Sequence, residues 1–422
     1  MRLLFPILVL ALLAPVLASQ AVITSVFKPP VTGKVVKVDV QGRLEVAVEG
    51  SEVPERIPLD EIEEVNFGQQ GDERKPADAP LRVYLVNGDV LYGTPDVSPD
   101  GDEESFVLRG KRFTDIRIRN DAVSRIEYVA NVQPNTLPEL AADEKVDVVH
   151  WAAVGETPAQ VDRGSELVRV TKEGVWLYNA TLDGDKYEGV KYDWNRIRGI
   201  VCYRPKYKPF DKLMGIFTLR DGTILSGVLT SWGEGKLKLE HTALKGRRAT
   251  DKVEIALEEA NLISISMKNG KYIYLSDMEF AETPKERPFY LPADFNYDEY
   301  LFKIRRDQAQ GGGAISMRGK VYPKGLGVHA ISSVTYDLNR GYKRFLCDIG
   351  VDDSAGELAS VEFKVYVDGK LVYESGVLLR SSPVKTLDID VLNARQIKLE
   401  VLAADNADIQ DRANWANAKL VR

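Results

Sequence analysis

The chain has 422 residues, of which 44% are hydrophobic and 28% are charged, and its formal net charge is -7. This composition excludes a disordered or collagen-like chain, and at roughly 150 residues per domain the length predicts about three domains. The chain has 56 Lys and Arg residues against 63 Asp and Glu residues, and it has no long run of basic residues. We therefore do not expect nucleic acid as a partner.

The N-terminus has the pattern of a secretory signal peptide. One positive charge, on Arg2, precedes an apolar stretch from Leu3 to Leu17, and the small residue Ala18 follows. The stretch is shorter than the ~20 residues that a membrane-spanning helix needs, and it contains prolines. We therefore expect residues 1–18 to be removed, no membrane span to remain, and the mature protein to be secreted, periplasmic or part of the cell envelope.

The few histidines and cysteines lie far apart, which argues against a zinc site built from them. Cys202 and Cys347 fall in different proposed modules, and an oxidising compartment permits a disulfide between them. Each lies in an apolar, strand-like run, however, which is typical of a buried thiol. Two separate buried thiols are therefore the favoured interpretation, with the disulfide as the alternative.

An internal repeat organises the first two thirds of the chain. The same ending recurs four times: an apolar residue is followed three and five positions later by two others. The endings are Ile62, Val65 and Phe67; Val123, Ile126 and Tyr128; Ile197, Ile200 and Cys202; and Leu262, Ile265 and Met267. Four such endings predict four similar units.

Two of these units also share their beginning. Residues 83–93 match residues 217–227 at every apolar, turn and glycine position, and their central dipeptides are Asn87-Gly88 and Asp221-Gly222. Such dipeptides between alternating apolar runs predict hairpins with type I′ turns. Each unit is thus predicted to be a small β-meander that bends into a barrel and buries one face. The pattern resembles Sm-like barrels, here acting as spacers or protein-contact modules rather than as RNA binders.

Segments rich in proline, glycine and charge separate the predicted units and mark their boundaries. The predicted division is 1–18 for the signal peptide, 24–68, 80–130, 146–204 and 212–280 for the four β-repeats, 281–294 for a linker, and 295–422 for a C-terminal domain. Little helix is expected anywhere in the chain.

The C-terminal third has a different pattern. Residues 361–367 alternate between apolar and polar side chains, and an Asp368-Gly369 turn leads to a second strand at 370–373. Further strand-like runs lie at 334–338, 344–349, 386–391, 396–402 and 418–421. About seven or eight strands in this length predict a β-sandwich, so the expected fold class is all-β throughout.

Six motifs of this third, in the same order, resemble the NPCBM family of carbohydrate-binding modules. They lie at 325–329, 334–338, 342–345, 348–353, 363–369 and 411–418. The resemblance covers only this third of the chain. It implies a galactose-binding-like jelly roll in which loops at one end of the sandwich hold a sugar of galactose type or another glycan. Members of the family are often appended to glycoside hydrolases.

Candidate sugar ligands are loop residues with planar polar groups, which hydrogen bond to hydroxyls, and one aromatic residue for a sugar ring. They are His329, Asp352, Asp353, Asp411, Trp415, Arg306 and Asp307. Every candidate has a structural alternative: a loop-fixing hydrogen bond for His329, Asx turns for Asp352 and Asp353, a core position for Trp415, a solvated pair for Asp411, and a plain turn for the other two.

The sequence departs from the family pattern near its end. Arg412 and Asn414 stand where relatives have His and Asp, which puts polar ligand contacts in doubt. A calcium ion is common in galactose-binding-like folds, but the Asp and Asn residues here have no diagnostic spacing, so calcium remains open.

The sequence contains no G-x-S-x-G motif, no G-x-x-x-x-G-K-[ST] phosphate loop and no complete dinucleotide loop. Asp and Glu are so frequent that no pair of carboxylates stands out as that of a glycosidase. We therefore expect a secreted, non-catalytic carbohydrate-binding protein whose β-repeats space the C-terminal sandwich or contact other proteins. Two alternatives remain: a cell-envelope scaffold that has lost sugar binding, and an accessory subunit of a glycoside hydrolase.

Overall fold

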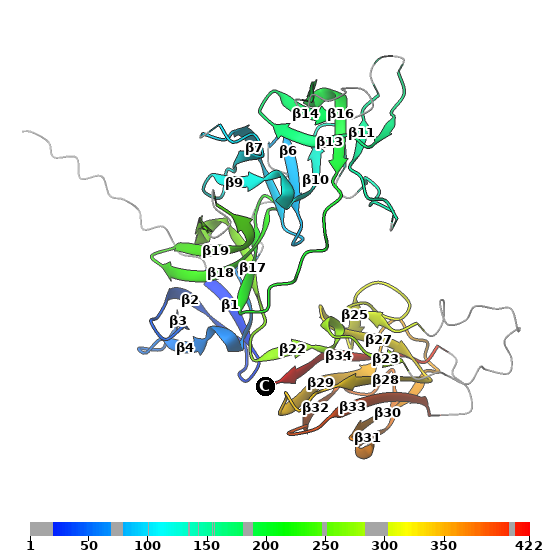
Figure 1. Cartoon of the computed structure of the whole chain (residues 1–422). Helices are drawn as coiled ribbons and strands as arrows, with labels where there is room; N and C mark the ends of the chain where they lie inside the picture. Colours follow the sequence, from blue (N-terminus) through cyan, green and yellow to red (C-terminus); the bar gives the residue numbers. More distant parts are fainter. Residues whose placement is uncertain are drawn as a thin grey trace, which may run out of the picture. The chain divides into compact units, whose positions relative to one another are not determined.

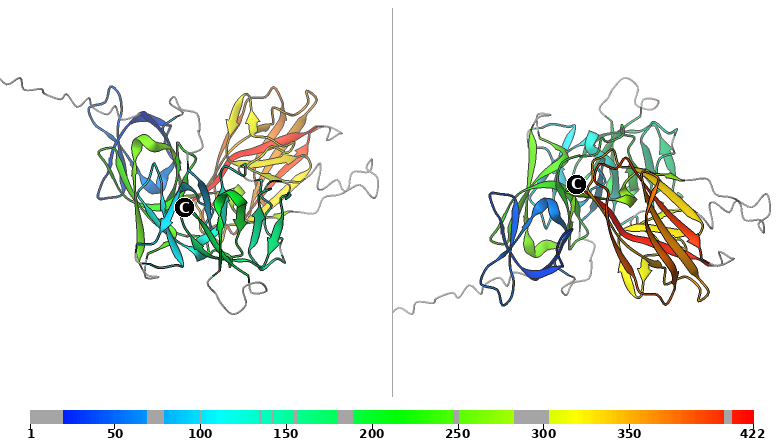
Figure 2. Two further views of the ribbon diagram at one scale, coloured as in Figure 1. Left: turned by 90° about the horizontal axis from the view of Figure 1, so that it is seen from above. Right: turned by 90° about the horizontal axis from the view of Figure 1, so that it is seen from below.

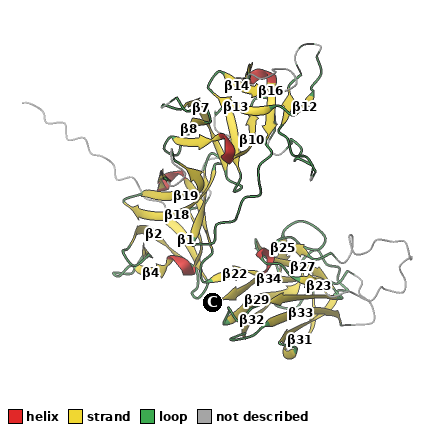
Figure 3. Cartoon of the chain, viewed as in Figure 1, coloured by secondary structure: helices red, strands yellow, loops and turns green. Residues whose placement is uncertain are grey.

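The computed structural model describes residues 20–68, 79–99, 101–133, 136–141, 143–153, 155, 157–179, 189–246, 251–282, 303–404 and 410–422. The expected signal peptide, residues 1–18, lies outside these ranges. The described part is built from β-strands and five single-turn 3-10 helices, which confirms the all-β class (Figure 3). Within it, no helix is both long and apolar enough to cross a membrane. The chain divides into two compact units, Met1–Gly270 and Lys271–Arg422 (Figure 1).

The first unit contains four repeats, and each repeat is a small antiparallel arrangement of strands with the same order. The first repeat comprises β1 (Gln20–Ser25), β2 (Val31–Val38), β3 (Arg43–Ala47), β4 (Glu55–Pro58), the 3-10 helix η1 (Leu59–Glu61) and β5 (Ile62–Asn66). Strand β1 pairs with both β2 and β5, and β3 pairs with β2 and β4. The strand order is therefore β5-β1-β2-β3-β4, which brings the last strand back beside the first.

The other three repeats have the same order. The second comprises β6 (Leu81–Leu85), β7 (Val90–Val97), β8 (Ser105–Arg109), β9 (Ile116–Arg119), η2 (Asn120–Ala122) and β10 (Val123–Tyr128). The third comprises β11 (Val148–Trp151), β12 (Val161–Arg163), β13 (Glu166–Val170), β14 (Gly174–Tyr178), β15 (Val190–Asp193), η3 (Trp194–Arg196) and β16 (Ile197–Val201), with β12 and β13 together in the place of one strand. The fourth comprises β17 (Met214–Leu219), β18 (Ile224–Gly233), β19 (Lys236–Lys245), β20 (Lys252–Glu258), η4 (Glu259–Asn261) and β21 (Leu262–Lys268).

A β-bulge explains the spacing of the recurrent ending. Each ending begins at the first residue of the last strand of a repeat, directly after the 3-10 helix. In all four repeats the register to the first strand shifts there by one residue, as when Ser25 faces Ile62 but Thr24 faces Glu64. The extra residue turns what would be a spacing of two into a spacing of three, so both apolar side chains stay on the buried face.

The last strands also join the repeats in pairs. Strand β5 pairs with β21, with Val65 opposite Ile265, and β10 pairs with β16, with Ile126 opposite Ile200. These four side chains are buried in one apolar cluster. The first repeat is therefore joined to the fourth, and the second to the third.

The turns at Asn87-Gly88 and Asp221-Gly222 differ from the expected type I′. Gly88 and Gly222 have φ of 89°, whereas Asn87 and Asp221 do not have positive φ. The amide of Gly88 donates to the carbonyl of Leu85, and Leu85 and Asp89 close the hairpin. The loop therefore has three residues, 86–88, instead of the two of a type I′ hairpin. A turn in which only the glycine is left-handed replaces type I′. At Asp368-Gly369 both residues have positive φ, of 49° and 80°, as type I′ requires.

The second unit is a sandwich of two antiparallel sheets (Figures 1 and 2). One sheet holds β24 (Arg305–Arg306), β27 (Gly325–His329), β34 (Arg412–Val421), β29 (Arg344–Val351) and β32 (Lys385–Asp390), with β22 (Tyr272–Tyr274) also on β34. The other holds β23 (Ala281–Glu282), β28 (Ser332–Asp337), β33 (Gln396–Ala403), β30 (Ser360–Val367) and β31 (Lys370–Leu379). Alternate residues of both sheets, such as Phe345 and Phe363, fill the core between them.

A short hairpin covers the outer face of the first of these sheets. It consists of β25 (Ile315–Met317) and β26 (Lys320–Tyr322). The side chains of Ile315, Met317 and Tyr322 pack with Ala416 of β34 into a small cluster of their own. This outer cluster buries polar groups of β34 beneath the hairpin, which matters for the candidate site.

The boundary between the units lies earlier than expected. Strand β22, within the predicted fourth repeat, pairs with the last strand of the sandwich, with Tyr272 opposite Val421. Strand β23, in the predicted linker 281–294, pairs with β28. The sandwich therefore begins at Lys271 rather than at 295, because residues after Gly270 add strands to its sheets. The rest of the predicted linker, residues 283–294, lies outside the described residues.

Both cysteines are free and buried, Cys202 in the first unit and Cys347 in the second. Burial raises the pKa of each thiol, which keeps both thiols protonated at neutral pH. The interpretation as two separate buried thiols is confirmed, and the disulfide is not formed.

A buried ion pair joins strands β6 and β10 of the second repeat. The guanidinium of Arg82 bonds to the carboxylate of Glu127, and both side chains are almost fully buried. The Nε group of Arg82 donates to Tyr92 Oη at 2.9 Å, and Tyr84 Oη donates to Glu127 at 3.1 Å. The pair is thus held within a polar network inside the repeat.

We expect Glu127→Ala to destabilise the first unit by about 3–5 kcal/mol, because it leaves the buried Arg82 charge without a carboxylate to balance it. Urea denaturation of the full chain measures the effect. The matched control is Glu254→Ala, which breaks an exposed pair with Lys238 and should cost about 0–1 kcal/mol. Equal effects of the two substitutions would contradict a structural role for the buried pair.

Candidate functional site

The loops of the sandwich gather at its two ends because successive strands run in opposite directions. The first loop end holds residues 330–331, 352–359, 380–384 and 410–411, and the second holds residues 338–343, 368–369 and 391–395. Sugar sites on such sandwiches are expected where loops converge, since side chains there are not committed to a sheet.

Asp352, at the first loop end, is 1% exposed and fully engaged within the protein. One carboxylate oxygen accepts from the amide of Ser354 at 2.9 Å and from its hydroxyl at 2.5 Å. The other accepts from Asn414 Nδ2 at 2.7 Å and from the amide of Ser316, in the outer hairpin, at 3.3 Å. Asp352 thus ties the hairpin and its own turn to β34, in agreement with its structural alternative.

Asp353 is partly exposed and caps the outer hairpin. Its two carboxylate oxygens accept from the amides of Arg318 at 2.8 Å and Gly319 at 2.9 Å. Its backbone carbonyl accepts from the guanidinium of Arg380 at 3.0 Å. These bonds hold the turn between β25 and β26.

The other candidates on β27 and β34 are buried. Trp415 is 1% exposed and packs edge to face on Phe363, with ring centroids 4.9 Å apart, in the core of the sandwich. Asp411 is buried and accepts from the amide of Ser360 at 2.9 Å. His329 is buried, with Nδ1 at the carbonyl of Ala330. Stacking of a sugar on Trp415 is therefore not available, and the core alternative holds.

Arg306 and Asp307 lie away from both loop ends, on the edge strand β24 and directly after it. Arg306 Nη1 donates to the carbonyl of Ser276 at 2.9 Å. Asp307 accepts from Lys324 Nζ at 2.6 Å and from the amide of Gly325 at 3.0 Å. Burial raises the pKa of Asp307, but these bonds outweigh it and hold the pKa below its ordinary value. The two residues fasten β24 to Ser276 and to residues 324–325 of the sandwich.

The structure places His329, Asp352, Asp353 and Asp411 at the first loop end, where each side chain bonds within the protein. A sugar hydroxyl needs a donor or acceptor that is exposed and uncommitted. The first loop end offers few such groups among the candidates.

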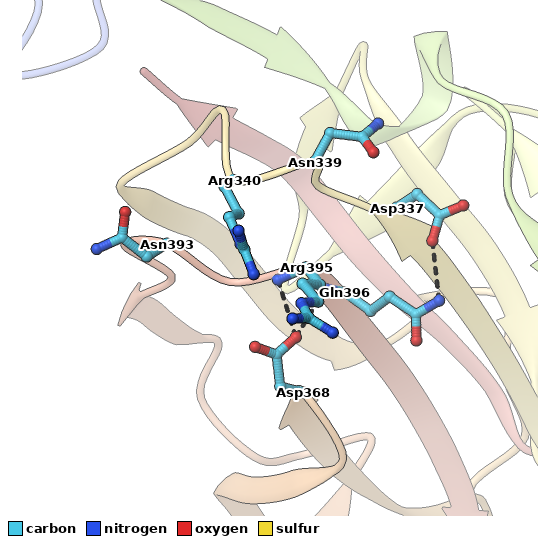
Figure 4. Close-up of a pocket in the computed structure, with 7 residues that line it drawn as sticks. All are labelled: Asp337, Asn339, Arg340, Asp368, Asn393, Arg395 and Gln396. Atoms are coloured by element: carbon cyan, nitrogen blue, oxygen red, sulfur yellow. Dashed lines mark hydrogen bonds between the residues drawn. The ribbon is translucent and has the colours of Figure 1, made fainter.

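The second loop end has an open depression with a different set of side chains (Figure 4). It is lined by Asp337, Asn339, Arg340, Asp368, Asn393, Arg395 and Gln396. All are polar, and five carry the amides or guanidinium groups that bind hydroxyls through paired, planar bonds. Asn339 and Arg340 come from the loop after β28, and Asn393 and Arg395 from the loop after β32, so two loops face each other across the depression (Figure 4).

Hydrogen bonds within the depression fix its floor. One oxygen of Asp368 accepts from the amides of Arg395 and Gln396, both at 2.9 Å. These two backbone bonds hold the pKa of Asp368 below its ordinary value, so the carboxylate stays ionised at neutral pH. Gln396 Nε2 donates to Asp337 at 2.9 Å. The three residues form a rigid base beneath the facing loops (Figure 4).

Four residues of the depression have a left-handed backbone. The φ angles are 49° for Asn339, 59° for Arg340, 49° for Asp368 and 62° for Asn393. Asn and Asp tolerate this conformation, whereas Arg rarely adopts it. Sequence reasoning missed this end because Asp368-Gly369 was used only as a turn signal, and nothing in one sequence marks the two loops as neighbours.

Among the described residues, no group of three or more His, Cys, Asp or Glu side chains is placed to hold a metal ion. Asp352 and Asp353, which are neighbours in the sequence, direct their carboxylate oxygens to different partners.

Comparison with known families identifies the second unit. The model of the NPCBM/NEW2 domain matches residues 271–421, which confirms the resemblance found in the sequence and agrees with the structural boundary. The match covers the whole sandwich, including β22, and none of the four repeats.

Two curated relatives carry glycosidase names. A protein of Renibacterium salmoninarum, named as an endo-alpha-N-acetylgalactosaminidase, is 29% identical over 167 residues, which are 39% of this chain and 10% of that protein. Alpha-1,3-galactosidase B of Akkermansia muciniphila is 32% identical over 119 residues, 27% of this chain and 15% of the relative. The chain thus spans only a small part of either relative.

Solved structures of CBM51 domains are also similar. One is CBM51 from Clostridium perfringens GH95 in complex with methyl-galactose, at 26% identity and a TM-score of 0.30, covering 36% of this chain and 99% of that one. Another holds CBM51-2 in complex with GlcNAc and INT domains from Clostridium perfringens ZmpB, at 26% identity and a TM-score of 0.31, covering 47% and 44%.

We expect Asp352→Ala to lower the stability of the second unit by about 1–3 kcal/mol, because it leaves the buried amide of Asn414 without its acceptor. Asp388→Ala is the control, since Asp388 forms an exposed pair with Arg344 that contributes about 0–1 kcal/mol. Urea denaturation of the full chain compares the two variants. Unchanged stability with weaker sugar binding would instead make Asp352 a ligand.

Proposed function

We propose that this chain, whose residues 271–421 form an NPCBM/NEW2 domain, is a secreted carbohydrate-binding protein without a catalytic role of its own. The sugar is held over the depression at the second loop end. The observation that carries this proposal is the convergence there of exposed amide and guanidinium groups in a domain of a carbohydrate-binding family. The signal peptide pattern of residues 1–18 supports the secreted location in this proposal.

The chemistry of the depression suits a polyhydroxylated ligand. The amides of Asn339 and Asn393 each offer one acceptor and two donors, whereas Gln396 already donates to Asp337 and offers its acceptor and one remaining donor. Vicinal hydroxyls need both kinds of group. The positions are fixed because the loops are held by Asp368 and by the bond from the amide of Arg340 to the carbonyl of Ala394, at 3.0 Å. Preorganised polar groups lose little freedom when a ligand binds.

The four repeats are proposed to space this domain or to contact other proteins. Their bulges lie where the last strand pairs with the first, so they help each sheet to close, and each repeat has the same strand order. A role as accessory to a glycoside hydrolase is favoured by the glycosidase names of the two relatives. In that arrangement catalysis would belong to another protein.

The test is a glycan-array screen of the full chain, with and without calcium, followed by titration of the sugars that bind. Asn393→Gly should weaken binding about tenfold, because the hydrogen bonds that the Asn393 amide makes to the sugar contribute about 1–1.5 kcal/mol of binding free energy. Glycine accepts φ of 62° without strain, so the fold is retained.

Asn417→Gly is the matched control, because Asn417 also has positive φ, of 52°, and lies in β34 away from the depression. Its affinity should equal that of the parent chain. No glycan bound by a folded full chain, under either condition, would overturn the proposal and favour a scaffold of the cell envelope that has lost sugar binding.

A further inference from the structure

We infer that the sugar bound at the second loop end carries an anionic substituent, a carboxylate or a sulfate, held between Arg340 and Arg395. This inference rests on the proposed function and adds the chemical class of the ligand. It depends on four observations: uncommitted guanidinium groups, committed carboxylates, a strained arginine backbone and the absence of aromatic side chains from the lining.

The guanidinium groups of Arg340 and Arg395 form no ion pair within the described part of the chain. The bonds of these two residues come from the backbone: the amide of Arg340 donates to Ala394, and the amide of Arg395 to Asp368. Arg344, in the same domain, is by contrast paired through two nitrogens with Asp388. Two arginine forks therefore face the depression with their donors available.

The two carboxylates of the depression already have donors. Asp368 accepts two backbone amides, and Asp337 accepts the side-chain amide of Gln396. Asp368 lies in the β30–β31 turn, where its bonds tie that turn to the start of β33. The acceptor oxygens are thus used for structure. The charges of Arg340 and Arg395 help to lower the pKa of Asp368, but no hydrogen bond from either guanidinium to a described residue accompanies that attraction.

The backbone of Arg340 is a second argument. Its φ of 59° is one that glycine adopts freely and arginine rarely, and the next residue is Gly341. Strained positions of this kind are concentrated at binding and catalytic sites, where the side chain has a use that offsets its conformational cost. The side chain of Arg340 extends over the depression toward Arg395 (Figure 4).

The lining also lacks an aromatic ring. Neutral sugars are held largely by an aromatic face against the apolar side of the ring, together with hydrogen bonds. None of the seven lining residues is aromatic, so recognition here depends on polar and charged groups. A carboxylate or sulfate accepts paired bonds from guanidinium groups, which are stronger than bonds between neutral partners.

The experiment compares galactose with galacturonic acid and galactose 6-sulfate, which differ from it only at C6, by calorimetric titration of the full chain. We expect an anionic sugar to bind at least tenfold more tightly than galactose at low salt, and this preference to shrink as salt is raised. The two anionic sugars distinguish a carboxylate from a sulfate ligand.

Arg340→Gly should reduce the preference for the anionic sugar about tenfold, with thermal stability equal to or above that of the parent, because the strain is removed. Arg318→Gly is the matched control: Arg318 has φ of 54°, is exposed in the β25–β26 turn, and lies away from the depression. Its ratio of anionic to neutral affinity should equal that of the parent.

Binding of galactose or another neutral glycan without an anionic preference would overturn this inference and leave the proposed function in place. Binding of no glycan at all would overturn both. An anionic preference that survives Arg340→Gly and Arg395→Gln would place the anionic group elsewhere and also contradict the assignment.

Discussion

Burial of one face of every sheet is the constraint on which both units depend. In the repeats the sheet is only five strands wide, so it hides that face by bringing the last strand back to the first, as β5 does with β1. The return requires a bulge after each 3-10 helix, and the bulge sets the spacing of apolar residues in all four endings. In the second unit a second sheet provides the cover instead, and the loops are left at the two ends.

The two loop ends of the sandwich use similar residues differently. At the first end the outer hairpin lies over β34, so Asp352 and Asn414 are buried and bonded to each other. At the second end no hairpin of the described residues covers the sheet. The polar side chains of the facing loops remain exposed there, next to the hydrogen bonds of Asp368. Covering, rather than residue type, therefore separates structural polar groups from those available to a ligand.

The sequence alone was sufficient for the all-β class, for the shared endings and for the family of the last third. These features depend on local patterns: period-two alternation, turn dipeptides and short motifs. The boundary at Lys271 was not predicted, because residues 272–274 pair with residues 419–421, nearly 150 positions away. The type of the turn at Asn87-Gly88 was also missed, since it depends on how the flanking strands close.

Residue chemistry and tertiary structure thus determined different things about this protein. The sequence by itself determined the strand pattern of the sandwich, and with it that Asp352 and Asp353 would lie in a loop directly after a strand. Only the tertiary structure decided which side chains are accessible. Exposure of Arg340 and burial of Trp415 depend on strands and loops distant in the chain, whose packing no local pattern records.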